Sequence, residues 1–390
     1  MADTPNVRFK GFTEDWEERK LGEVAVEFKS GVSLPTDEME TEGMYPVYGG
    51  NGLRGYASTY NHDGEFALIG RQGALCGNMN YSYGKAYFTE HAVVVKANEN
   101  NITRFLYYML DTMKLGQYSD QSAQPGLAVN KLIRLNNMFP KRQEQEQIGN
   151  YFNNLDHFIT LHQRKHDETK ELKKYMLQKM FPENGKKIPE IRFAGFTDDW
   201  ELRKLNEIAE KVTEKNKNNI YTEPFTNSAE MGIISQKDYF DREVVNEGNL
   251  DGYYVVKVDD FVYNPRVSVT APVGPINRNR LGRNGVMSPL YTVFRTHEIN
   301  TLYLEYYFKT TKWHRFMKLN GDSGARFDRF TIATSQFMEM PIPYPDLKEQ
   351  IKIGQYFDNL DNLITLHQRK CDELKEVKKF MLQNMFPQKG

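Results

Sequence analysis

The sequence is short of the features that define several common classes of protein. Its 390 residues include only two cysteines, Cys76 and Cys371, so neither a disulfide framework nor a cysteine-ligated zinc site is expected, and a reducing cytoplasm is the predicted location. No run of about 18 apolar residues is available to span a membrane, and the N-terminal MADTPNVRFKGF lacks the basic and apolar regions of a signal peptide. The formal net charge is only −1, so a polyanionic partner must bind a local basic patch.

Motifs for catalysis and cofactor binding are also missing. Residues 50–55 read GNGLRG, the glycine spacing of a dinucleotide-binding loop, but they lie between strand-like segments and no helix follows. There is no GxxxxGK[ST] phosphate loop, and Asn264-Pro265-Arg266 is not the N-P-P-[YF] segment of amino-methyltransferases. His157, His162 and His166 share a helical segment, but no acidic or cysteine partner repeats with them in the second copy. The sequence therefore predicts no catalytic residues and no metal site.

What the sequence does contain is a duplication. Residues 148–182 and 353–387 are identical at 26 of 35 aligned positions, and the short repeats 7–25 and 191–209 are identical at 13 of 19. Trp16 and Trp200 fall at the same place in the short repeat and are interpreted as core or interface anchors. Between short and long repeats lie two longer blocks that do not resemble each other. This layout predicts four segments: 1–141 and 183–346, each a short repeat with its block, and 142–182 and 347–390, the long helices.

The two blocks are predicted to be mixed α/β. In the second block, residues 210–260 carry 6 basic and 11 acidic residues, whereas residues 261–330 carry 11 basic and 4 acidic. This step favours a basic face for an anionic ligand over a chance fluctuation on a solvated surface. Strands are predicted from apolar runs and helices from longer periodic segments: strands at 45–48, 66–69, 92–95, 253–256, 261–263 and 291–294, and helices at 102–113 and 302–318.

Each long helix shows a coiled-coil spacing with apolar ends and a polar middle, LHQRK, that is identical in both copies. Asp346 and Glu349 are expected to form a capping box. Residues 183–190 reach at most about 28 Å, so the chain returns through the second block, and an antiparallel pair with the blocks at opposite ends is expected. The residues predicted for the helix-pair seam are Ile148, Leu155, Phe158, His162, Leu172 and Met176, with Ile353, Leu360, Leu363, His367, Val377 and Met381.

Several further segments carry a resemblance. They are F-x-G-F-T-x-D-W, residues 45–52 (YPVYGGNG), 124–126 (QPG), 285–291 (GVMSPLY), L-D-x-x-I-T-L-H-Q-R-K, and an E-Q-x-x-I-G helix start in which Glu146 is read as shifted relative to Glu349-Gln350. Together they resemble the specificity (S) subunit of type I restriction–modification systems over essentially the whole chain. The resemblance implies an α/β (α+β) fold with an internal pseudo-two-fold repeat. Two mixed α/β target-recognition domains are separated by a pair of long antiparallel coiled-coil helices.

The resemblance also implies a function in host defence. Each domain would read one half of a bipartite double-stranded DNA target, and the chain itself would be non-catalytic and bind no cofactor. It would bind two modification (methyltransferase) subunits, which carry S-adenosylmethionine and methylate DNA. Restriction (translocase/nuclease) subunits would add ATP- and Mg-dependent cleavage in the full complex. No membrane is expected as a partner.

Base edges in the major groove are best read by Arg at guanine and by Asn or Gln at adenine. Half or more of protein–DNA contacts go to phosphate and sugar, so only some candidates will touch bases. Ser268 and Thr270 are expected to support a strand edge in the groove. The DNA-binding candidates are Asn51, Arg54, Arg71, Gln72, Asn78, Gln121 and Gln124 in the first block, and Asn264, Arg266, Asn277, Arg278, Asn279, Arg280, Arg283, Arg326 and Arg329 in the second.

Two other functions are consistent with parts of the pattern. A protein–protein scaffold without DNA readout, with the helices as a dimerisation rod, predicts no basic face and no salt-sensitive DNA binding. A methyltransferase fused to recognition domains needs a cofactor-binding domain, for which the repeats leave no room.

Overall fold

The computed structural model describes residues 4–119, 126–183, 185–239, 250–322 and 328–387. The chain divides into two compact units, residues 1–164 with 367–390 (unit 1) and residues 165–366 (unit 2). The two long helices, α3 (Arg142–Lys179) and α9 (Leu347–Asn384), each contribute one part to either unit. The predicted segment boundaries, which set each helix apart, stay a prediction. None of the helices in the described ranges combines the length and hydropathy of a membrane span.

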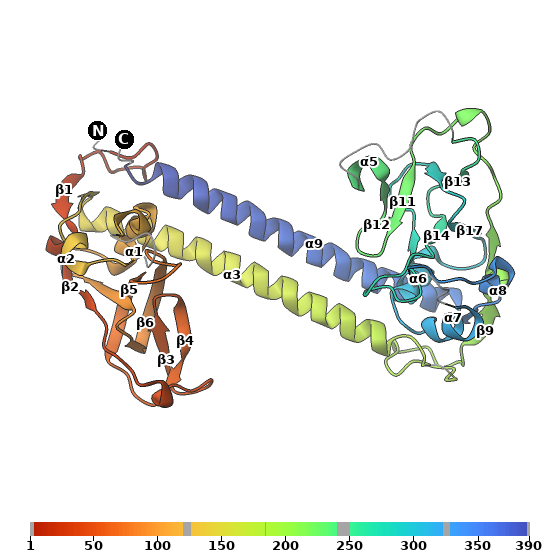
Figure 1. The fold of residues 1–390 in the computed structure, drawn as a ribbon, viewed down its shortest axis with the longest axis horizontal. Helices are drawn as coiled ribbons and strands as arrows, with labels where there is room; N and C mark the ends of the chain where they lie inside the picture. The colour runs from red at the N-terminus through yellow and green to blue at the C-terminus, as the bar shows by residue number, and fades with distance from the viewer. Residues whose placement is uncertain (1–3, 120–125, 184, 240–249, 323–327, 388–390) are drawn as a thin grey trace. The chain divides into compact units, whose positions relative to one another are not determined.

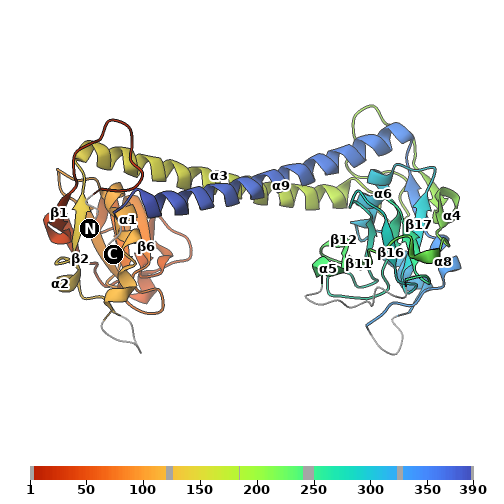
Figure 2. The same ribbon diagram turned by 90° about the horizontal axis from the view of Figure 1, so that it is seen from above.

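Unit 1 is built on a six-stranded sheet of order β2-β7-β5-β6-β3-β4, with helix α1 against one face (Figures 1 and 2). Alternate residues of β5 point to opposite faces: Ala67 and Ile69 join the cluster under α1, and Phe66 and Leu68 join a second cluster with Phe88. The elements are β2 (Ala25–Ser30), β3 (Tyr45–Gly49), β4 (Gly52–Ala57), β5 (His62–Gly70), β6 (Met79–Phe88), β7 (Ala92–Ala97) and α1 (Thr103–Thr112), with the short helices η1 (Leu21–Glu23), η2 (Thr36–Glu38), η3 (Leu115–Tyr118) and α2 (Val129–Leu132).

Unit 2 has a four-stranded sheet of order β10-β17-β14-β15 and the separate pairs β11–β12 and β13–β16. Its main cluster gathers aromatic side chains of the sheet and of helix α6, including Phe261, Phe294 and Tyr303. The elements are β10 (Ala209–Lys211), β11 (Phe225–Ser228), β12 (Gly232–Ser235), β13 (Tyr254–Val256), β14 (Phe261–Tyr263), β15 (Ile276–Arg278), β16 (Gly285–Met287), β17 (Thr292–Thr296), η4 (Lys217–Asn219), α4 (Leu205–Ile208), α5 (Gln236–Tyr239), α6 (Thr301–Phe308), α7 (His314–Asn320) and α8 (Thr334–Met338).

All six strands predicted from apolar runs are present, in β3, β5, β7, β13, β14 and β17. The single helix predicted at 302–318 is wrong, because the chain forms α6 and α7 with a turn between them. The turn buries Trp313, which is 2% exposed, and its indole nitrogen donates to the carbonyl oxygen of Phe308 at 3.2 Å. Burying this large ring outweighs continuing the helix.

The short repeat serves the same purpose in both units. Strand β1 (Glu17–Lys20) pairs with β8 (Asn136–Phe139), and β9 (Glu201–Lys204) pairs with β18 (Pro341–Tyr344), in each case next to the start of a long helix. Trp16 and Trp200 are both 3% exposed, which confirms their interpretation as core anchors. The short repeat therefore holds the entrance of its long helix against the block.

The E-Q-x-x-I-G motif explains how that entrance is fixed. Arg8 donates to both carboxylate oxygens of Glu144 at 2.6 and 2.8 Å, and Arg192 does the same to Glu349 at 2.7 and 2.8 Å. The first motif thus begins at Glu144, and the shift of Glu146 read from the sequence is wrong. The predicted capping box is confirmed in its first half, because Asp346 accepts from the backbone nitrogens of Lys348 and Glu349, whereas the carboxylate of Glu349 binds Arg192.

The glutamine and glycine of the same motif hold the block helices. Gln145 accepts a hydrogen bond from the backbone nitrogen before α1, and Gln350 accepts one from the backbone nitrogen before α6, at 3.0 and 2.9 Å. At Gly354 an added Cβ would lie 2.7 Å from Leu302, so only glycine allows α6 to approach α9 this closely. Both blocks are therefore anchored through equivalent residues.

Within each unit the two long helices run antiparallel. In unit 1, Asp156 of α3 pairs with Lys378 of α9, and the Nδ1 atoms of His162 and His367 are 3.0 Å apart. In unit 2, Lys173 pairs with Asp361. This confirms the predicted pairing through the LHQRK segments.

The predicted seam is correct at eight of its twelve positions, the two histidines included, and wrong at four. Ile148, Leu155, Ile353 and Leu360 are buried, and Met176 and Met381 pack against the two main clusters. Phe158, Leu172, Leu363 and Val377 are instead exposed by 48, 45, 44 and 44%. Next to Phe158 and Leu363 the covered positions lie one residue further on, at the half-buried Ile159 and Ile364, and seven residues before these Phe152 and Phe357 are both 0% exposed. Adjacent apolar residues at these places fit either register, so the spacing alone does not distinguish them.

Candidate nucleic-acid interface

In unit 1, three loops meet at one end of the sheet. The nitrogen of Arg71 donates to the carbonyl oxygen of His91, and the nitrogen of Leu127 to that of Arg71, both at 2.9 Å. Gln72 forms an isolated bridge with Gly126. An added Cβ on Gly50 would lie 2.9 Å from the His91 oxygen, so the β3–β4 turn also belongs to this group. We call this surface, formed by residues 49–54, 71–78 and 89–91, the unit 1 tip.

Five of the first-block candidates lie at the unit 1 tip. Asn51, Arg54, Gln72 and Asn78 are exposed and Arg71 is half-buried. His91, which was not predicted from the sequence, also lies here, and its Nδ1 is 3.2 Å from the side-chain oxygen of Gln72. In the sequence, the short loops that precede and follow β6 are the feature that could have indicated that His91 lies at this surface. Gln121 and Gln124 lie outside the described residues.

Unit 2 presents a corresponding surface at the β14–β15 loop. Arg266 forms an isolated antiparallel bridge with Arg329, and the nitrogen of Phe330 donates to the oxygen of Pro265 at 2.7 Å. Asn264 fixes the loop from inside, donating to the oxygen of Asn227 at 2.7 Å and accepting from the nitrogen of Arg266 at 2.9 Å. We call residues 264–271 with 328–330 the unit 2 tip.

The two tips occupy equivalent places in their units. Each is the loop that joins two antiparallel strands, and each is bridged to the segment just before a short helix, α2 or α8. Both loops end in a glycine with positive φ, Gly77 at 86° and Gly274 at 82°. The side chains displayed differ, which is what two different ligand surfaces on one kind of scaffold require.

Two predicted DNA-binding residues are instead internal. Asn277 is 4% exposed and donates to the side-chain oxygen of Asn227 at 2.6 Å. Asn279 is 0% exposed and donates to the oxygens of Lys257 and Arg283, both at 3.0 Å. With their amides used inside the unit, neither is available to read a base in this structure.

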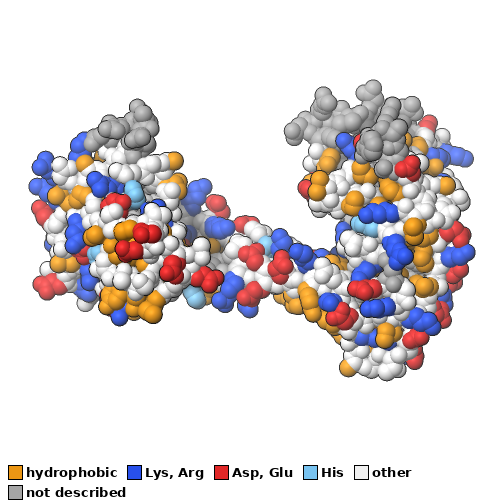
Figure 3. All heavy atoms as spheres, turned by 60° about the horizontal axis from the view of Figure 1, so that its bottom comes forward, with side chains coloured by type: hydrophobic (Ala, Val, Ile, Leu, Met, Phe, Trp, Pro, Cys, Tyr) orange, Lys and Arg blue, Asp and Glu red, His pale blue; other side chains and the backbone are white. Residues whose placement is uncertain are grey.

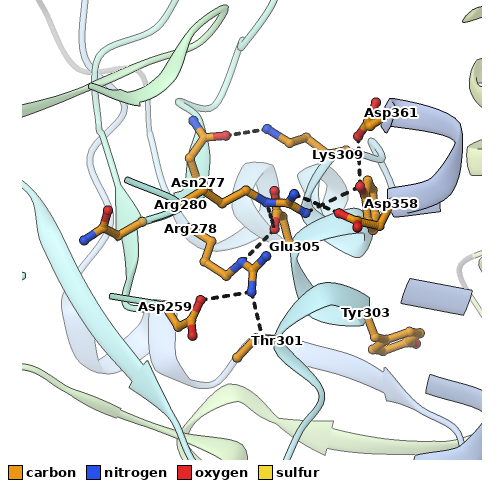
Figure 4. A network of polar contacts seen from close by, with 12 residues as sticks. Asp259, Asn277, Arg278, Arg280, Thr301, Tyr303, Glu305, Lys309, Asp358 and Asp361 are labelled. Carbon is orange, nitrogen blue, oxygen red and sulfur yellow. Dashed lines mark hydrogen bonds and ion pairs between the residues drawn. The ribbon is translucent and has the colours of Figure 1, made fainter. Parts of the chain in front are cut away.

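Arg278 and Arg280 are held in a network around Glu305 (Figure 4). Both donate to the same Glu305 oxygen, at 2.7 and 2.8 Å, and Arg280 also reaches Asp358 of α9 at 2.8 Å. Burial opposes the charge of Arg280, but Glu305 and Asp358 outweigh it and raise its pKa above the ordinary value. Burial lowers the pKa of the neighbouring Lys309, against the attraction of Glu305. The network therefore joins β15 to α6 and α9 and is structural.

Arg283, the next candidate, is also paired. It donates to both oxygens of Glu223 at 2.7 Å, and this hydrogen bonding lowers the pKa of Glu223. Arg295 binds Asp260 at 2.7 and 2.8 Å in the same way. The acidic part of the second block thus neutralises much of its basic part, and Figure 3 shows Lys and Arg mixed with Asp and Glu over the visible face of each unit. The charge step in the sequence largely reflects pairing within unit 2.

Arg266 and Arg329 are the second-block candidates that remain exposed without an ion pair to any residue that the structure describes. Arg326 lies outside the described residues. No group of three or more His, Cys, Asp or Glu side chains is placed to hold a metal ion in the part of the chain that is described.

Comparison with known proteins identifies the family. The model of the type I restriction modification DNA specificity domain matches residues 13–171 and 197–376. The chain is 43% identical over 157 residues to the type I restriction enzyme EcoprrI specificity subunit of Escherichia coli, a match that covers 38% of each chain. It is 22% identical over 396 residues to the type I restriction enzyme MjaVIII specificity subunit of Methanocaldococcus jannaschii, covering 94% of this chain and 91% of that one.

A solved structure supports the fold. The crystal structure of a type I restriction-modification system S subunit from M. genitalium matches with a TM-score of 0.67 at 14% identity, over 99% of this chain and 100% of that chain. The domain is matched once in each half of the chain, and each match includes most of a long helix. The chain therefore belongs to the type I restriction modification DNA specificity domain family.

Proposed function

We propose that this chain is the DNA specificity subunit of a type I restriction–modification complex, in which each unit reads one half of a bipartite double-stranded target. The proposal rests on one observation: the ion pairs that hold the long helices are duplicated in the two units, whereas the surfaces at the tips differ. The pairs Arg8–Glu144 and Arg192–Glu349 repeat, whereas the bridge at the tip is Gln72–Gly126 in one unit and Arg266–Arg329 in the other. Base contacts specify sequence, so unlike tips suit unlike half-sites.

A duplicated surface on the long helices suits duplicated partners. Leu172 and Tyr175 of α3 are 45 and 49% exposed, and their counterparts Val377 and Phe380 of α9 are 44 and 56% exposed. Residues three apart share a helix face, and exposed apolar patches mark interaction surfaces. Because the same patch occurs in each copy of the helix, we assign it to two modification subunits, one for each copy.

A cleft of about 570 Å³ in unit 1 supports the same assignment. It lies between the end of α1 and the paired helices, and its wall includes Asp156, Lys375 and Lys378. Nine of its ten lining residues have an identical counterpart in the other half of the sequence; the exception is Asp111, whose counterpart is Lys309. A lining that is repeated this closely fits a partner that is present twice.

The chain is proposed to be non-catalytic. In the part of the chain that the structure describes, a polar cluster such as the Glu305 network consists of structural ion pairs. S-adenosylmethionine would be bound by the modification subunits, and ATP and Mg²⁺ by restriction subunits of the full complex. The long helices would set the spacer between the half-sites.

The test is a domain exchange read by methylome sequencing. The chain is expressed with its modification subunits, and residues 45–136 are replaced by the equivalent stretch of another specificity subunit. One half of the methylated motif should change and the other should stay. A simultaneous change of both halves, or methyl transfer by the purified chain alone, contradicts the proposal. Native mass measurement should find two modification subunits in each complex.

A further inference from the structure

The unit 2 tip ends in a tight turn whose outermost side chain is Val269. The nitrogen of Ala271 donates to the oxygen of Ser268 at 3.2 Å, and the nitrogen of Ser268 donates to the oxygen of Ala271 at 3.1 Å. Val269 and Thr270 are therefore the two residues of a hydrogen-bonded ribbon end. Ala271 is 7% exposed and anchors this end, whereas Val269 is 101% exposed. The result is a narrow projection with an apolar side chain at its extremity.

The fold gives no reason for a valine at this place. Turns favour Gly, Asn, Asp, Pro and Ser, which supply either the backbone conformation or a local hydrogen bond. Valine is β-branched and is enriched in half-buried strands instead. Ser268 and Thr270 on either side have the polar character that a solvated turn requires, and their hydroxyl oxygens are 3.2 Å apart. A single exposed apolar residue is ordinary on a protein surface, so a second observation has to point to a ligand.

That observation is the pair of arginines at the base of the turn. Arg266 and Arg329 are directly opposite each other across an antiparallel bridge, where like charges destabilise pairing. Both are exposed, and neither forms an ion pair with a residue that the structure describes. Elsewhere in the block the arginines at 278, 280, 283 and 295 all bind carboxylates. Two opposite arginines without a carboxylate partner among the described residues are suited to binding anions.

We propose that Val269 is a specificity-determining residue that packs against the 5-methyl group of a thymine, while Arg266 and Arg329 bind the flanking phosphates. The inference rests on the proposed function of unit 2 as the reader of one half-site. The major groove is about 12 Å wide and admits a two-stranded β-ribbon, and thymine is the base that presents a methyl group there. An apolar end on a narrow ribbon with cationic sides matches that surface.

The experiment removes the methyl group from the DNA and the valine from the protein, separately and together. The full chain in complex with its modification subunits is bound to the target at fixed salt. Each thymine of the unit 2 half-site is replaced in turn by deoxyuridine, which lacks only the 5-methyl group. The variants are Val269→Ala and the isosteric Val269→Thr. Val258→Ala is the matched control, because Val258 is also exposed, at 42%, in the same unit.

With the unsubstituted chain, deoxyuridine at one position should weaken binding about fourfold, as expected for one methyl group withdrawn from an apolar contact. With Val269→Ala the same DNA substitution should have no further effect, whereas Val258→Ala should retain the fourfold loss. An equal loss with Val269→Ala, or no loss at any thymine, overturns the inference.

The same assay distinguishes a failure of this inference from a failure of the proposed function. A complex that binds no bipartite sequence refutes the proposed function itself. If Val269→Ala lowers the thermal stability of the complex, Val269→Thr decides, because it keeps the shape but has one methyl group fewer. A deoxyuridine effect reduced to about half of the wild-type value supports the contact. An undiminished effect, equal to that measured with Val258→Ala, overturns it.

Discussion

Replacing Glu349 by glutamine should destabilise the entrance of α9 more than the same change at its counterpart Glu144. The Glu349 side chain is 0% exposed and binds Arg192 with both oxygens, and one of these also accepts from the indole nitrogen of Trp200 at 3.0 Å. Breaking a buried ion pair by removing one charge costs about 3 kcal/mol at the lower end of the usual range. We use the lower end because Arg192 is 14% exposed and water relieves part of its charge.

The matched change at Glu144 isolates the tryptophan bond. Glu144 is 1% exposed and binds Arg8 in the same geometry, but the indole nitrogen of Trp16 has no partner among the described residues. Glu144→Gln should therefore cost less by one hydrogen bond to a charged group, about 1.5 kcal/mol. Glu373→Gln, at an exposed pair with Lys370, should leave stability unchanged.

Hydrogen exchange resolved by peptide measures these effects unit by unit, because it reports local opening free energies. The peptides of interest cover the two short repeats, 7–25 and 191–209. Faster exchange should appear in 191–209 for Glu349→Gln and, to a smaller extent, in 7–25 for Glu144→Gln. Equal effects of the two variants would show that the tryptophan bond contributes nothing, and an effect of Glu349→Gln no larger than that of Glu373→Gln would refute the whole account.

Three further outcomes are expected. Inserting four residues after Lys173 and four after Lys378 lengthens each helix by about 6 Å and turns it about 40° beyond a full turn. The methylated motif should then gain one spacer base pair, with both half-sites unchanged. Methylation at the original spacing would refute the proposal that the helices set the spacer. Arg329→Ala should reduce the salt slope of DNA binding by about one, whereas Arg280→Ala should lower stability without changing that slope. A reversed pattern in the salt titration would contradict the assignment of Arg329 to DNA binding and of Arg280 to the internal network. Burial lowers the pKa of His314 to about 4 from 6.5. The unfolded chain then binds the proton more tightly, so stability should fall as the pH drops from 6.5 to 4, and a denaturation series in which His314→Gln has the same pH dependence would refute this.

Much of the fold could be predicted because its signals are local. The duplicated segments, the strands and the extents of the long helices follow from repetition and from apolar periodicity. Four of the twelve seam positions were wrong because adjacent apolar residues, such as Phe158 and Ile159, fit a coiled-coil spacing equally well. Only the packing of Phe152 against Phe386, with ring centroids 5.9 Å apart, selects the register, and that contact joins residues far apart in the sequence.

The candidate site could be predicted less well for the same reason. Arginine is the right residue type for guanine or phosphate, but an arginine that already binds a carboxylate has its charge neutralised and one edge of its guanidinium occupied. Glu305 lies 25 residues from Arg280, and Glu223 lies 60 residues from Arg283, so neither pairing leaves a mark on the local sequence. Val269 was not predicted as a DNA-binding residue because the candidates were chosen for hydrogen bonding, which a valine side chain cannot provide. Its position between Ser268 and Thr270 was the feature of the sequence that could have indicated it.

The pairing of these arginines bears on where DNA affinity comes from. Each neutralised phosphate releases counterions, and the number of free cations sets the salt slope. The chain has a net charge of −1, and in unit 2 the arginines at 278, 280, 283 and 295 are already neutralised by carboxylates. At the unit 2 tip, residues 264–271 with 328–330, the exposed cations are Arg266 and Arg329, so this tip can discriminate between sequences while contributing little non-specific attraction. The chain without partner subunits should therefore bind DNA weakly and with a shallow salt dependence, and adding the modification subunits should steepen it. A slope that is equally steep for the isolated chain would mean that the internal ion pairs open on DNA and that their arginines join the interface.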